Sequence, residues 1–250
     1  MTRTCLRLRR RQLIPSAIAS AVTVGISRPS LVRSASTTTL TFVPYADLAL
    51  IDPLASALVT RNHVLMVFDT LFGLDERRMP QHQMLAGHTV DAEAQSWTLT
   101  LRDGLWFHDG TPVLARDVVA SLRRWATRDA MGDALMAATD ELSARDDTTI
   151  VFRLKRPFPM LPAALGKPTN NIPAIMPERL ASLPTDKMLT EIVGSGPFRF
   201  LPDEYVSGGH AGFARFDRYK PRQEPASYAA GGHRVMVDRV EWKIIPDAAT

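Results

Sequence analysis

The 250-residue sequence predicts a mixed α/β fold, α+β in arrangement, built from many short elements. Trp97–Leu101 (WTLTL) and Thr148–Leu154 (TTIVFRL) alternate apolar and polar residues, which is the period of a half-buried strand. Val118, Leu122 and Trp125 recur at helical spacing and predict one buried helix face. Proline occurs 18 times and clusters between the periodic stretches, which favours short elements over long helices.

The first elements of the chain are predicted from the same two patterns, the alternation of a strand and the spacing of a helix. Thr38–Val43 alternates and predicts the first strand, and a turn follows over 47–53. Leu65, Phe68 and Phe72 recur at helical intervals, so we expect a helix over 62–74 that the charged run after it ends.

The middle of the chain predicts a hairpin followed by a covering helix. The strand over 97–101 is followed by Gly104 in a turn and by a return strand over 105–108. A second turn, Asp109-Gly110-Thr111-Pro112, leads into the helix that carries the buried stripe. Ser121 and Arg124 are expected on its other, polar faces.

The remaining elements are predicted in the same way. They are a strand over 148–154, short helices over 161–165 and 176–183, strands over 198–201, 213–216 and 237–245, a polar loop over 220–233, and the start of a helix within 246–250.

The amino-terminal segment has the layout of an export signal. Residues 1–36 hold seven arginines and no acidic residue, then an apolar stretch too short to span a membrane, then small residues. The pair Arg10-Arg11 resembles a twin-arginine signal. We therefore expect residues 1–36 to be a cleaved signal peptide and the mature protein to be exported.

The net charge and the cysteine content of the residues after 36 argue against a nucleic-acid-binding protein and against a thiol enzyme. Without the seven amino-terminal arginines, 23 basic residues remain against 26 acidic ones, a net charge of −3. Nucleic-acid binding requires a basic surface, so that class is excluded. Cys5 precedes the apolar stretch, which leaves the mature chain without a thiol and without a lipid-anchoring cysteine.

Motifs for catalysis and metal binding are also missing from the sequence. Ser195 lacks the flanking glycines of a nucleophile elbow, and Gly194 and Gly196 lack the third glycine of a dinucleotide loop. The six histidines show none of the spacings that place two metal ligands on one element. Asp109 and His108 are expected to bond within their own turn. The sequence predicts no catalytic residue, no metal, no cofactor and no enzyme activity.

The order of several segments nevertheless points to a family. The run from Trp97 to Trp125 (WTLTLRDGLWFHDGTPVLARDVVASLRRW) is followed by TTIVFRLKRPFP, VGSGPFRF and VDRVEWKIIPDAAT. This order resembles the extracytoplasmic solute-binding proteins of ABC importers, family 5, which carry oligopeptides, dipeptides and nickel chelates. The resemblance covers Thr38–Thr250 and corresponds to the amino-terminal portion of a family member.

The resemblance implies a type II periplasmic-binding-protein-like fold, which has two lobes around a cleft. It assigns 37–68 and 174–250 to an incomplete first lobe and 69–173 to an extra domain specific to the family. The positions that match the family's ligand contacts are Leu58, Val59, Thr60, Arg61, Met131, Asp133, Lys167, Asn170 and Asn171. In the family, the segment matching 58–61 can pair its backbone with an extended peptide.

The implied function is capture of a peptide or related small solute in the periplasm, with delivery to the permease subunits of an ABC transporter by a monomeric protein. Three alternatives remain open. They are a truncated fragment without binding function, an exported sensory or chaperone-like binding module, and an exported hydrolase that reuses the fold. Peptide, metal-chelate, opine and sugar binders share these motifs, so the sequence does not identify the ligand.

Overall fold

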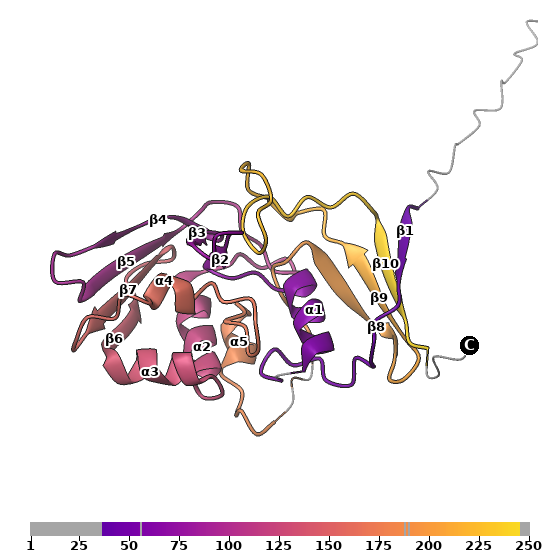
Figure 1. Ribbon diagram of the computed structural model, residues 1–250, viewed down its shortest axis with the longest axis horizontal. Coiled ribbons are helices and arrows are strands. Elements are labelled where there is room, and N and C mark those ends of the chain that lie inside the picture. Colours follow the sequence, from indigo (N-terminus) through magenta and orange to yellow (C-terminus); the bar gives the residue numbers. More distant parts are fainter. Residues whose placement is uncertain (1–36, 56, 188, 190, 246–250) are drawn as a thin grey trace, which may run out of the picture. The chain divides into compact units, whose positions relative to one another are not determined.

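The structure, a computed structural model, describes residues 37–55, 57–187, 189 and 191–245 (Figure 1). The predicted signal peptide over 1–36 and the helix start within 246–250 lie outside these residues. No helix of the described part is long and apolar enough to span a membrane.

The first sheet joins the two ends of the described chain. It contains β1 (Thr39–Phe42), β8 (Phe198–Val206), β9 (His210–Arg215) and β10 (Arg239–Lys243) in the order β1-β10-β9-β8. β1 runs parallel to β10, and the other neighbours are antiparallel. These strands confirm the expected strands near 38–43, 198–201, 213–216 and 237–245.

α1 (Leu58–Val67) covers one face of this sheet (Figure 1). The His63 ring lies against Phe200 and Phe213, with ring centroids 5.2 and 5.8 Å away. The predicted helix over 62–74 is wrong at both ends, because the backbone is already extended at Phe68. The apolar residues after it belong to β2 (Phe72–Leu74), which pairs with β3 (Pro80–His82).

The second large sheet is antiparallel throughout. It contains β4 (Leu85–Val90), β5 (Ser96–Leu101), β6 (Thr139–Ala144) and β7 (Thr149–Leu154) in the order β4-β5-β7-β6. The predicted return strand over 105–108 is wrong, because β5 pairs with β4 and β7. Residues 105–113 instead close a narrow loop, in which the N–H of Phe107 donates to the carbonyl of Thr111.

Helices α2 (Ala115–Ala126) and α3 (Ala130–Ala138) pack beside the second sheet (Figure 1). The predicted stripe is confirmed, since Val118, Leu122 and Trp125 are buried. Ser121 and Arg124 are buried too, against expectation. Two single-turn helices complete the fold, α4 (Leu161–Ala164) and α5 (Glu178–Ala181).

The turn after Phe107 contacts the segment 194–196, which leads into β8 of the first sheet. His108 accepts the Gly194 N–H at Nδ1 (3.4 Å) and lies 3.0 Å from the Gly196 carbonyl through Nε2, so Nε2 carries the proton. The expectation that His108 bonds within its own turn is therefore wrong. Asp109 does bond within the turn, to the N–H and hydroxyl of Thr111, and it also pairs with Arg179.

Candidate ligand-binding site

The residues expected to contact an extended peptide lie in the first turn of α1. Val59 and Thr60 are buried, whereas Leu58 is 57% exposed and Arg61 is partly exposed. The N–H of Arg61 already donates to the carbonyl of Ala57, so this segment is helical and does not present a strand edge. The N–H groups of the residues before Arg61 have no partner inside the helix, because a helix leaves its first N–H groups unpaired.

The two other predicted segments meet at the corner between α2 and α3. Asp129 caps α3 by accepting the N–H groups of Met131 and Gly132, and it forms an ion pair with Lys167. Asn171 donates from Nδ2 to the carbonyl of Arg128 at 2.6 Å. The sequence did not identify Asp129, although an Asp followed by a short apolar run is a helix-cap signal.

At this corner, some of the predicted residues are buried and stabilise the fold, and others are exposed to solvent. Asn171 is buried, and its backbone carbonyl accepts the indole N–H of Trp125 at 2.8 Å. Met131 is partly buried, while Asp133 and Asn170 are exposed. Asn170 has a φ of 52°, a left-handed conformation that asparagine tolerates better than most residues. α1 approaches this corner further along, where Val64 and Leu65 line a cavity of about 20 Å³ with Lys167.

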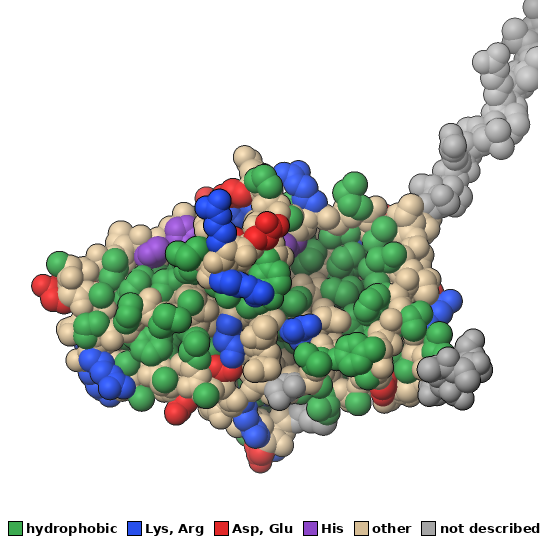
Figure 2. Space-filling view, in the orientation of Figure 1, with side chains coloured by type: hydrophobic (Ala, Val, Ile, Leu, Met, Phe, Trp, Pro, Cys, Tyr) green, Lys and Arg blue, Asp and Glu red, His purple; other side chains and the backbone are tan. Residues whose placement is uncertain are grey.

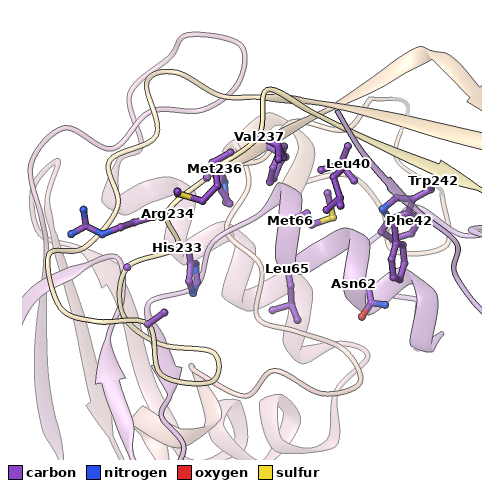
Figure 3. Close-up of a pocket in the computed structure, with 16 residues that line it drawn as sticks. Leu40, Phe42, Asn62, Leu65, Met66, His233, Arg234, Met236, Val237 and Trp242 are labelled. Atoms are coloured by element: carbon purple, nitrogen blue, oxygen red, sulfur yellow. The ribbon is translucent and has the colours of Figure 1, made fainter. Parts of the chain in front are cut away.

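An apolar groove that the sequence did not reveal lies beside α1 (Figure 3). Its volume is about 720 Å³. β1 and β10 supply one wall, α1 supplies the second, and the chain before β10 supplies the third; the labelled lining residues are Leu40, Phe42, Asn62, Leu65, Met66, His233, Arg234, Met236, Val237 and Trp242. Figure 2 shows hydrophobic side chains gathered on this part of the face, between α1 and β1.

The groove exposes apolar surface that a folded protein ordinarily covers. Leu40 is 52% exposed and Met236 is 86% exposed. β1 is the last strand of its sheet on this side, so one of its backbone edges has no strand partner among the described residues. Exposed apolar patches next to a free strand edge are typical of surfaces that another chain segment covers.

A buried ion pair holds the segment that leads into α1. Arg124 on α2 contacts Asp52 at 3.1 Å, and its other terminal nitrogen donates to the carbonyl of Leu183. The two side chains are only 1% and 12% exposed. The pair therefore ties the loop before the first turn of α1 to the region of the second sheet.

Two histidines are kept neutral inside this framework. Burial lowers the pKa of His63 to about 3, and the Ile51 backbone opposes that shift in part. Burial also lowers the pKa of His108 to about 4, and the Gly196 carbonyl opposes that shift in part. Both rings serve the packing of the fold, because a neutral ring is what their apolar surroundings accept.

The neutral histidines predict that the protein loses stability in mild acid. The unfolded chain takes up protons below a pH of about 6.5, whereas folded His63 stays neutral down to a pH of about 3. Each such histidine therefore costs about 1.4 kcal/mol of unfolding free energy per pH unit below 6.5. We expect His63→Leu to reduce the fall in unfolding free energy by about 0.7 kcal/mol between pH 7 and 6 and by about 1.2 kcal/mol between pH 6 and 5, measured by urea unfolding. The same slope in His63→Leu as in the parent would contradict this account, and His210→Gln, an exposed histidine, is the control.

Comparison with known proteins finds similarity to bacterial solute-binding proteins. The family model of bacterial extracellular solute-binding proteins, family 5 Middle, matches residues 80–250. A probable peptide ABC transporter periplasmic-binding protein of Sinorhizobium fredii is 37% identical over 243 residues, which is 96% of this chain and 45% of that protein. The probable D,D-dipeptide-binding periplasmic protein DdpA of Escherichia coli is 33% identical over 109 residues, or 42% of this chain and 21% of DdpA.

Two solved structures share the fold over most of this chain and over less than half of their own length. NikA from Brucella suis in complex with Fe(III)-EDTA has a TM-score of 0.69 at 18% identity, covering 84% of this chain and 40% of NikA. Listeria monocytogenes OppA bound to peptide has a TM-score of 0.67 at 18% identity, covering 86% of this chain and 44% of OppA. The type II periplasmic-binding-protein fold is thus confirmed, and the chain spans less than half the length of these relatives.

Proposed function

Because the chain belongs to family 5 of the bacterial extracellular solute-binding proteins, we propose that it provides the first part of a protein that captures a peptide or related small solute. Capture is non-covalent, takes place in the periplasm after removal of the signal peptide, and ends with delivery by a monomer to the permease subunits of an ABC importer. The observation that carries the proposal is the family match over 80–250, together with a fold that solved solute-binding proteins share.

The two-part organisation is the first element of the proposal. The strands of the first sheet come from 39–42 and 198–243, and those of the second come from 85–154. This distribution supports a first lobe made from 37–68 and 174–250 and an extra domain made from 69–173. The Arg124–Asp52 ion pair and the His108 contacts then fix the extra domain against the first lobe.

Ligand contact is assigned to the first turn of α1 and to the nearby corner around Lys167. The N–H group of the exposed Leu58, at the start of that turn, can donate to a carboxylate or carbonyl oxygen of a peptide, and the positive end of the helix dipole favours such an acceptor. Leu58 and Arg61 supply the exposed side chains there. Lys167 offers a positive charge once its contact with Asp129 loosens. Val59, Thr60 and Asn171 support the contact residues from beneath.

The apolar groove is assigned a different role. More than half of each matched relative has no counterpart in this chain, so an intact protein of the family contains much further chain. We propose that such chain covers the groove, adding a strand to the free edge of β1 and burying Leu40 and Phe42. The solute then needs to contact only the more polar surface near α1 and the corner.

The test uses a fusion of this chain to the unmatched part of its 37% identical relative. Calorimetry with a mixture of short peptides should show micromolar binding by the fusion, and Lys167→Met should weaken it by about tenfold. Arg116→Met, which removes an exposed charge, is the matched control and should bind like the parent.

Two outcomes would contradict the proposal. A fusion that folds but binds no peptide or related solute would remove its central claim. Binding that survives in Lys167→Met with unchanged affinity would remove the corner from the site. The exposed groove favours one second candidate, a chaperone-like module. Suppression of aggregation of an unfolded protein by the chain, without solute binding by the fusion, would support that candidate.

A further inference from the structure

Two histidines that lie six positions apart in the sequence meet where β3 approaches β4, a strand of another sheet. Nε2 of His82, on β3, lies 2.8 Å from Nδ1 of His88, on β4. The ring centroids are 5.0 Å apart and the rings are nearly perpendicular. Figure 2 shows histidine side chains side by side at the surface over this part of the fold. The nitrogens are close enough for one proton, or one metal ion, to be shared between them.

An aromatic frame holds both rings in place. The His88 ring stacks on Trp97, with centroids 5.5 Å apart and planes 22° apart. The buried Phe72 ring contacts both histidines, at 5.4 and 5.7 Å. Metal affinity is gained when ligands are fixed before the metal arrives, because less side-chain freedom is lost on binding. The frame therefore keeps the two rings close together at the surface, although each ring must still turn from its hydrogen-bonded orientation to bind a metal.

The distance between the nitrogens favours one coordination geometry. With metal–nitrogen bonds of about 2.05 Å, nitrogens 2.8 Å apart subtend roughly 86° at the metal. That angle suits a square-planar or tetragonal site, whereas a tetrahedral angle would need nitrogens about 3.3 Å apart. A rotation of each ring that turns its lone pair off the line between the nitrogens would complete the geometry. Among divalent ions, Cu²⁺ combines this geometry with the tightest binding to nitrogen ligands.

Among the described residues, the surroundings supply no side-chain ligand beyond the two imidazoles. No three His, Cys, Asp or Glu side chains of the described part are placed to share a metal. Glu224 and Asp75 line a polar pocket of about 270 Å³ with His82, but Glu224 is paired with Arg222 and Asp75 accepts backbone N–H groups. Water from the solvent side would fill the remaining positions.

We propose that His82 and His88 form a surface site for a tetragonal divalent cation, Cu²⁺ in the first instance. The site is separate from the proposed solute site, since neither histidine lines the groove or the corner around Lys167. Solute capture and metal binding are therefore tested independently.

The test titrates Cu²⁺ into the purified full chain and its variants. Every sample carries Cys5→Ser, because a thiol would bind or reduce Cu²⁺. We expect one Cu²⁺ per chain at pH 7.5, with an electron paramagnetic resonance spectrum that shows two imidazole nitrogens. His82→Gln and His88→Gln should each weaken binding by about tenfold or more and remove one nitrogen from the spectrum. His210→Gln, an exposed histidine on β9, should bind like the parent.

Further readouts separate this site from adventitious binding. Zn²⁺, which prefers a tetrahedral site, should bind more weakly than Cu²⁺. Binding should decrease as the pH falls, because protons compete for both nitrogens. Thermal unfolding of each variant establishes that it is folded. Cu²⁺ affinity that is equal in the parent and in both folded histidine variants would overturn the proposal, as would a spectrum with a single nitrogen in the parent.

Discussion

Replacing Gly194 with Ala is expected to destabilise the protein by about 3 kcal/mol or more. A Cβ at this position would lie 2.0 Å from the carbonyl oxygen of Val67 and 2.8 Å from its carbon. Backbone at the end of α1 cannot move aside as a flexible side chain could, since the N–H of Gly196 donates to the same carbonyl. The free energy of unfolding in urea, or the yield of folded protein, measures the effect.

Gly87→Ala provides the matched control. Gly87 lies in β4, and a Cβ there would have no atom within 4 Å. Its effect should stay within about 0.5 kcal/mol, as for surface substitutions in general. An equally small loss of unfolding free energy in Gly194→Ala and Gly87→Ala would contradict the close approach of residues 194–196 to the end of α1. That contact holds α1 and its first turn in position.

Removing Arg124 is expected to have the other large effect. Arg124→Ala leaves Asp52 buried without its partner and the carbonyl of Leu183 without its donor. Breaking a buried ion pair from one side costs about 3–5 kcal/mol. The loss should appear in the free energy of unfolding.

A double-mutant cycle separates the pair from its surroundings. In Arg124→Met combined with Asp52→Leu, neither charge is left alone, so the double variant should be more stable than the sum of the single changes predicts. Arg116→Ala, in an exposed ion pair with Glu178, should cost about 1 kcal/mol or less. Strict additivity of the Arg124 and Asp52 changes would show that the two side chains do not interact.

The strands and the main helix were predictable because their periodicity is local. Trp97–Leu101 and the stripe of Val118, Leu122 and Trp125 lie where their spacing placed them. The helix over 62–74 failed because tertiary contacts overrode propensity: Asp69 bridges Ile175, and Phe72 pairs with His82 in a strand. β4 and β6 were missed because their outward positions carry little alternation of apolar and polar residues, as the run LAGHTV shows.

The site was predictable only in part, because long-range contacts decide which polar residues are free. Arg124 looks like a surface residue on a helical wheel, and only the approach of Asp52 explains its burial. The pairing of Lys167 with Asp129 and the meeting of His82 with His88 depend in the same way on folding. The resemblance to the family supplied the candidate contact residues, and their contact with solute stays a prediction.

Native mass spectrometry of the protein isolated from its host's periplasm tests the central claim most directly. Solute capture predicts a native mass that exceeds the denatured mass by that of a peptide or similar small molecule, and fragmentation of the released molecule would identify it. The export prediction requires the denatured chain to lack the segment near residues 1–36. Equal native and denatured masses for a folded protein, under conditions that preserve weak complexes, would contradict the claim that the protein to which this chain contributes captures a solute.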